Sequence, residues 1–305
     1  MMTPRVGLSL AVDDGFRAAT SPLFEAGLID VVEWSFDVAW AFGKNPTPKW
    51  VSAVCDLYSN AGRLYGHGVA FSALSASWEE RQERWLAHLA RELERRRYVH
   101  VSEHMGFMSA RGFHPGAPLP VPMTDEAIRA GRYALGRLRD VVGEPMGLEN
   151  LAPVLARRDA EEQGDFMEAL LAPQDGFVLL DLHNVFCQSF NLGIPVPELL
   201  ARMPLSRVRE IHVSGGSLWK PVVDPKRTLR ADTHNGPVPA EVMDAIPLAL
   251  RACPNVEVVF LERIGETLDA QEDADQFRRD FVNLRAKVEE ARRPMRTHES
   301  APVLA

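Results

Sequence analysis

The stretch "VREIHVSG", residues 208–215, is the one from which the fold class can be worked out. Within it, Ile211 and Val213 flank His212. Because successive side chains of a strand point to opposite faces, the run predicts a strand whose apolar residues face helices. His212 would then face the interior of a barrel, close to the C-terminal end of the strand.

Seven further β-rich runs surround this one along the chain. They are residues 6–10, 31–35, 63–69, 98–104, 145–150, 177–184 and 256–263. The spacers carry amphipathic helical patterns, as in 77–97 and 125–143. Eight strand–helix units in one chain predict an α/β fold, a single-domain (β/α)8 TIM barrel. An open doubly wound sheet is the alternative, but no G-x-G-x-x-G motif follows the first run.

The barrel is expected to use residues 1–290, and residues 291–305 are expected to form a disordered tail. No apolar run approaches the roughly 18 residues that span a bilayer. The three cysteines are scattered and no signal peptide is visible, which favours a cytoplasmic protein. A net charge of −8 argues against a nucleic-acid or anionic-membrane partner.

Polar residues that can bind metal stand near the ends of six consecutive runs. They are His67, His104, Glu149, Asp181, His212 and Glu262. Barrel enzymes place their catalytic groups at this end of the strands. One such residue alone would be read as a hydrogen-bonded structural histidine or a helix cap, but the whole set favours a site.

Three further candidates are expected on the loops that follow the strands. Asn184 lies three residues after Asp181. Asp232 and His234 belong to "ADTHNGPVP", residues 231–239, and would point to the same side if this segment is extended.

The set contains nine candidate ligands, more than one ion takes, so two or three ions sharing carboxylates are expected. Imidazole and carboxylate without thiolate suit iron, manganese or zinc. Glu149 and Glu262, expected on neighbouring elements, could bridge the ions.

The motifs around these residues resemble those of the multinuclear non-haem iron-dependent oxidases, the methanobactin-oxidase-like enzymes that modify ribosomally made peptides. The resemblance covers roughly residues 6 to 265. It rests on "YGHGVAFS", "VSEHMGF", "GLENLA", "LLDLHNVFCQSFNLG", "REIHVSGG", "ADTHNGPVP" and "VFLER". The same ligand order also resembles the wider superfamily of endonuclease IV-like and xylose isomerase-like barrels.

The resemblance implies a ligand set for each of three ions. The first would be held by His67, His104 and Glu149. The second would share Glu149 and take Asp181, His212 and Glu262. The third would take Asn184, Asp232 and His234. Glu149, Asp181 and His212 would be the catalytic residues. The residue at position 184 distinguishes two of the families that the chain resembles. The resemblance implies a histidine here in the endonuclease-like branch and an asparagine in the oxidase family, so Asn184 favours the oxidase family.

The chain departs from the family pattern at two places. Gly216 stands where a second histidine commonly follows His212, and His183 stands where an asparagine usually precedes Asn184. His183 could be a ligand or a hydrogen-bond donor to one. Cys187 is expected to be an ordinary loop residue.

The resemblance further implies two or three iron ions in a mixed Fe(II)/Fe(III) state, with O2 as co-substrate. A residue of a precursor peptide would be oxidised: cysteine first, by β-carbon excision or oxazolone–thioamide formation, otherwise aspartate or asparagine. A partner protein that recognises the leader peptide would complete a heterodimer. Trp219, Lys220, Lys226 and Arg227 of "SLWKPVVDPKR", residues 217–227, could hold the peptide or belong to a surface loop.

Three other functions fit parts of this pattern. A metal-dependent phosphodiesterase of the endonuclease IV type would use zinc to activate water, although the chain is acidic. A sugar isomerase or epimerase with one Mn or Mg ion would leave His67 and His104 unexplained. A non-catalytic barrel could sequester metal.

Overall fold

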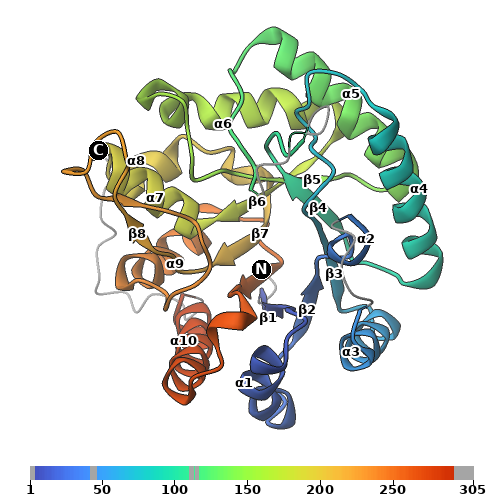
Figure 1. Ribbon diagram of the computed structural model, residues 1–305, viewed down its shortest axis with the longest axis vertical. Helices are drawn as coiled ribbons and strands as arrows, with labels where there is room; N and C mark the ends of the chain where they lie inside the picture. Colours follow the sequence, from blue (N-terminus) through green and yellow to red (C-terminus); the bar gives the residue numbers. More distant parts are fainter. Residues whose placement is uncertain (1–3, 42–46, 110–112, 114–116, 292–305) are drawn as a thin grey trace.

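The computed structural model describes residues 4–41, 47–109, 113 and 117–291. Eight parallel strands form a closed barrel in the order β1-β10-β7-β6-β5-β4-β3-β2 (Figure 1). The strands are β1 (Arg5–Ser9), β2 (Val31–Trp34), β3 (Leu64–Gly68), β4 (Val101–His104), β5 (Gly147–Glu149), β6 (Phe177–Asp181), β7 (Val208–Val213) and β10 (Val258–Leu261). Every run expected to be a strand contributes one to this barrel.

Helices surround the strands in the ring expected of a (β/α)8 barrel (Figure 1). They are α1 (Asp14–Glu25), α2 (Val38–Ala41), α3 (Lys49–Asn60), α4 (Glu80–Arg95), α5 (Asp125–Val142), α6 (Arg157–Leu171), α7 (Leu182–Leu192), α8 (Val196–Ala201), α9 (Ala240–Ala252) and α10 (Gln271–Glu290). The single-domain α/β barrel is confirmed, while the expected tail lies, from residue 292 on, outside the described residues. No helix among those described is long and apolar enough to cross a membrane.

The expected strand 177–184 is three residues too long. β6 ends at Asp181, whose Oδ1 accepts the backbone N–H of Asn184 at 2.5 Å and so caps α7. The strand therefore changes directly into a helix, and Asn184 lies in the first turn of α7 rather than on a loop. Cys187, which was also expected on a loop, is buried in the same helix.

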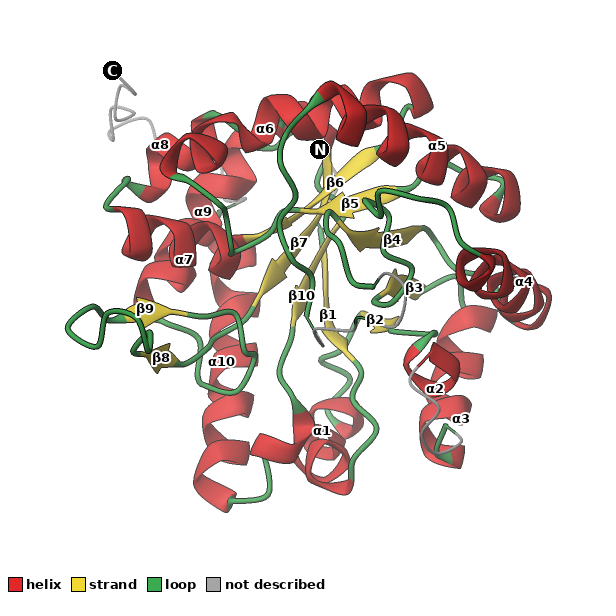
Figure 2. Cartoon of the chain, turned by 45° about the horizontal axis from the view of Figure 1, so that its top comes forward, coloured by secondary structure: helices red, strands yellow, loops and turns green. Residues whose placement is uncertain are grey.

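The segment 217–227 contains one short strand and continues as an exposed turn. Two short antiparallel strands, β8 (Leu218–Trp219) and β9 (Leu229–Arg230), form a hairpin outside the barrel, and β9 packs against α7 (Figure 2). At the tip of this hairpin Val222 and Val223 are exposed.

The apolar core lies mainly between the barrel and its helices. Inside the barrel a separate small apolar cluster consists of Val31, Tyr65, Val258 and Phe260. Much of the remaining interior carries buried polar side chains, among them Glu33, His67, Glu210 and His212. Because a buried charge is costly unless it is paired, these residues need partners across the barrel.

Candidate metal centre

The residues singled out at the ends of the strands meet at the C-terminal rim of the barrel. His104, Glu149 and Asp181 are the last residues of β4, β5 and β6, and Glu262 follows β10 directly. His67 and His212 are the penultimate residues of β3 and β7. Each of these six residues belongs to at least one of four groups of three side chains, and within each group the ligand atoms lie within 4.8 Å of one another.

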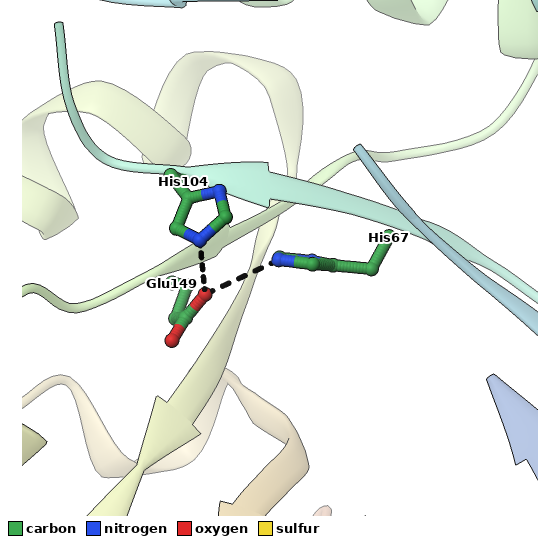
Figure 3. Close-up of side chains that lie close together, drawn as sticks. All are labelled: His67, His104 and Glu149. Carbon is green, nitrogen blue, oxygen red and sulfur yellow. Dashed lines mark ion pairs between the residues drawn. The ribbon is translucent and has the colours of Figure 1, made fainter. Parts of the chain in front are cut away.

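The first group consists of His67, His104 and Glu149. Both imidazoles direct Nε2 at the same carboxylate oxygen: His67 Nε2 and His104 Nε2 each lie 3.3 Å from Glu149 Oε2 (Figure 3). On the far side of the His67 ring, Nδ1 lies 2.8 Å from Ser102 Oγ, so a neighbouring strand holds the ring in place.

The second group, Glu149, Asp181 and His212, is fully buried. Asp181 uses Oδ1 to cap α7, but its Oδ2 has no hydrogen-bond partner among the described residues. Asn184 donates through Nδ2 to Glu149 Oε1 at 3.2 Å and to the carbonyl oxygen of Asn150 at 2.9 Å. Its own Oδ1 is buried and also lacks a hydrogen-bond partner in this described region.

The third group joins Asp181 to His234 and Glu262. The Glu262 carboxylate lies between two imidazoles, with Oε2 3.2 Å from His212 Nδ1 and Oε1 3.3 Å from His234 Nδ1. Asp232 Oδ1 lies 2.7 Å from His234 Nε2, on another edge of that ring.

Asp232 and His234 do converge, but not because the segment is extended. His234 adopts a left-handed backbone, with φ of 51°, and the segment forms no strand. The side chains therefore meet through a turn, in a conformation uncommon for residues other than glycine. Glu149 and Glu262 are not on neighbouring elements either, because β6 and β7 separate their strands. The residue common to the second and third groups is Asp181.

His183 fills the space beside Gly216. A Cβ added to Gly216 would lie 2.8 Å from His183 Cε1 and 2.1 Å from the Ala231 carbonyl oxygen. The buried His183 ring directs Nδ1 at Asp232 Oδ1, 3.0 Å away, and the Cys187 sulfur lies 3.8 Å from its Nε2. Burial raises the pKa of the Cys187 thiol, which therefore stays protonated and makes a poor ligand.

Two carboxylates at the site escaped the sequence reasoning. Glu33 on β2 and Glu210 on β7 form a fourth group with His212, deeper in the barrel. The available signal was the alternation of side chains along a strand. Glu210 lies two residues before His212 and so shares its face, and Glu33 is the only charged residue of "VVEWS".

The charges of the site are strongly coupled. Burial opposes protonation of His67, but the hydrogen bond to Glu149 and the Glu33 carboxylate outweigh it and raise the pKa of His67 to about 9. Burial, with the Asp232 and Glu149 carboxylates nearby, raises the pKa of Asp181 well above its ordinary value.

For the Glu262 carboxyl group the balance is reversed. Burial would raise the pKa of Glu262, but the neighbouring His234 and His212 hold it well below its ordinary value. For His234, burial likewise works against the charged form, and Asp232 and Glu262 raise its pKa nevertheless. Without metal, His67, Asp181 and His234 therefore tend to hold protons. A metal ion must displace these protons to bind the same side chains.

The donor set fits a multinuclear metal centre of imidazole and carboxylate. The Asp181 Oδ2 and Asn184 Oδ1 acceptors are buried without a hydrogen-bond partner in the described structure, and each such acceptor is costly unless something compensates it. Asn184 is hydrogen-bonded to Glu149, and Asp181 itself belongs to two of the candidate groups. A cation at this place would satisfy them.

A family model described as "RiPP precursor modification enzyme MbnB/TglH/ChrH" matches residues 46–279, where RiPP denotes a ribosomally synthesised and post-translationally modified peptide. A UPF0276 protein of Rhizorhabdus wittichii is 32% identical over 176 residues, which are 58% of this chain and 60% of that protein. A UPF0276 protein of Acaryochloris marina is 28% identical over 220 residues, 68% of this chain and 76% of that protein.

Solved structures show the same barrel at low sequence identity. Endonuclease IV from Thermus thermophilus is 18% identical with a TM-score of 0.52, covering 94% of this chain and 100% of that one. A 3-keto-D-glucoside 4-epimerase from E. coli is 16% identical with a TM-score of 0.55, covering 93% of this chain and 99% of the other. These likenesses concern the fold alone.

Proposed function

Because this chain belongs to the family of RiPP precursor modification enzymes MbnB/TglH/ChrH, we propose that it is an iron-dependent, O2-using oxidase that modifies one residue of a ribosomally synthesised precursor peptide. Cysteine is the first candidate for that residue, and aspartate and asparagine follow. The observation that carries the proposal is the chain of overlapping imidazole–carboxylate groups at the rim of the barrel.

Two or three iron ions would be bound by the side chains of the rim. The proposed ligands are His67, His104, Glu149, Asp181, Asn184, His212, Asp232, His234 and Glu262. Glu149 belongs to two of the groups and Asp181 to two, so one carboxylate can serve neighbouring ions. His183, hydrogen-bonded to Asp232, supports the third ion from outside its ligand set.

The side chains of the site differ in how deeply they are buried. Asp181 and His212 are fully buried, whereas His104, Glu262, Asp232 and His234 are partly exposed. We therefore place the substrate on the exposed side, where a peptide can reach the rim. Glu149, Asp181 and His212 act as the catalytic residues on the buried side, where water is excluded. When bound, iron supplies oxygen activation and the one-electron steps that these side chains cannot perform.

The β8–β9 hairpin is proposed to contact the precursor peptide, directly or through a leader-recognising partner protein. Its Trp219 is exposed, and Lys220, Lys226 and Arg227 are also at its surface. An extended peptide can pair with the edge of such a hairpin, with cations along it for acidic residues.

Elemental analysis of protein purified without air and without added zinc tests the metal assignment. Two or three irons per chain are expected, with Mössbauer spectra that change on exposure to oxygen. Zinc or manganese at full occupancy, with spectra indifferent to oxygen, would instead favour hydrolysis or isomerisation.

Metal affinity is expected to rise with pH up to about pH 9, because a metal must displace the proton that His67 holds in the metal-free protein. Each proton displaced makes the apparent affinity rise about tenfold per pH unit below that pKa. Zn2+ titrations at a series of pH values measure the slope. A flat profile between pH 6 and 9 would mean that His67 is not a ligand.

A further inference from the structure

The imidazole of His212 lies between the rim and a buried pair of carboxylates. Its Nδ1 lies 3.2 Å from Glu262 Oε2 at the rim. On the opposite edge, His212 Nε2 lies 3.0 Å from Glu33 Oε1 and 3.5 Å from Glu210 Oε1. The imidazole and the two carboxylates of this inner group are all buried.

Further contacts hold the two carboxylates in place. Ser9 Oγ donates to Glu33 Oε2 at 2.8 Å, and His100 Nε2 lies 2.8 Å from Glu210 Oε2. Glu33 reaches His212 from β2, which is not adjacent to β7 in the barrel. The contact therefore crosses the barrel interior and depends on its closure.

We propose that Glu33 is the positioning residue of His212, accepting a hydrogen bond from Nε2–H so that the Nδ1 lone pair faces the metal. This inference rests on the proposed metal centre. A histidine ligand commonly donates its second N–H to a carboxylate or carbonyl, which orients the ring and increases its basicity. His67 has a similar arrangement with the roles of its two nitrogens exchanged. Its Nε2 faces Glu149 at the proposed metal site, and its Nδ1 contacts Ser102 on the other side.

Glu33, Glu210 and His212 could alternatively hold a metal ion between them. Glu33 Oε1 lies 3.0 Å from His212 Nε2, so these two atoms satisfy each other as a hydrogen bond without an ion. Ser9 is hydrogen-bonded to one oxygen of Glu33, and His100 is hydrogen-bonded to one oxygen of Glu210. We therefore assign the pair to support His212 and not to bind a separate ion.

The test compares Zn2+ affinity, measured by competition with a chromophoric chelator, in the full chain. Glu33→Leu removes the acceptor without opening a cavity and is expected to weaken one Zn2+ site by about 10- to 100-fold. Glu33→Gln keeps an acceptor oxygen and should restore affinity close to that of the wild type. Tyr65→Phe, a change inside the same barrel that does not touch His212, should have no effect.

His212→Ala separates failure of this inference from failure of the proposed function. If His212→Ala weakens Zn2+ binding while Glu33→Leu does not, Glu33 has no positioning role and the metal centre stands. If neither the wild type nor His212→Ala binds Zn2+, the proposed metal centre fails and the inference fails with it.

A second measurement uses only the wild type and so does not depend on how the variants fold. In Zn2+-loaded protein carrying 15N-histidine, NMR should show His212 protonated at Nε2 and without a proton at Nδ1. A His212 ring protonated at Nδ1, with zinc on Nε2, would overturn the proposal.

Discussion

Asp181→Asn is expected to abolish turnover and remove the metal bound between Glu149 and His212, while the metal-free protein becomes more stable. Asp181 belongs to two of the four candidate groups, so this change removes a carboxylate that two neighbouring groups share. An amide is neutral and a far weaker ligand than a carboxylate for iron or zinc.

The gain in stability follows from the burial of Asp181. Its pKa is raised by burial and by the Asp232 and Glu149 carboxylates, so its charged form is disfavoured in the folded protein. The contribution of Asp181 to stability is thus present at acid pH and is lost as pH rises from its ordinary pKa towards the raised one. The advantage of Asp181→Asn over the metal-free wild type should accordingly grow with pH.

Asp181→Ala provides the contrast, because it also loses the cap of α7. The asparagine can still accept the N–H of Asn184, whereas the alanine cannot. Loss of such a cap costs about 0.5–2 kcal/mol. Thermal unfolding of the chelated proteins and iron analysis of the loaded ones measure both effects. His88→Ala, on α4 and stacked on Trp40, should leave the metal content unchanged. Full iron content in Asp181→Asn would contradict this arrangement of the centre.

Glu149→Gln is expected to cost more than one ion. One oxygen of Glu149 lies between His67 and His104, and the same side chain also belongs to the group of Asp181 and His212. A ligand common to two groups should, when neutralised, lower the occupancy of both. Loss of activity should therefore be complete, as for Asp181→Asn.

His104→Asn is the matched comparison, since this residue belongs to one group only. Iron per chain should fall by about one ion in His104→Asn and by more than one in Glu149→Gln, as measured by elemental analysis after anaerobic loading. Equal losses in the two variants would show that Glu149 serves a single ion.

Strand alternation made much of the site readable from the sequence. His212 between Ile211 and Val213 had to face the opposite side from its neighbours, whatever the rest of the chain did. Once eight such runs alternate with helices, the closed barrel brings their C-terminal ends to one rim. His67 and Glu149 could thus be expected to meet although they lie 82 positions apart in the sequence.

Contacts that depend on barrel closure or on single backbone torsions could not be read in this way. The pairing of Glu33 with His212 joins residues 179 positions apart across the interior, and no local pattern encodes it. His234 reaches Asp232 through a left-handed backbone, and Asn184 reaches Glu149 because the Asp181 cap starts a helix at once. The fold and most of the rim residues could be predicted from the sequence, because side-chain direction along a strand is a local property. Which nitrogen or oxygen each side chain presents became clear only in the folded chain, because that choice depends on partners from distant strands.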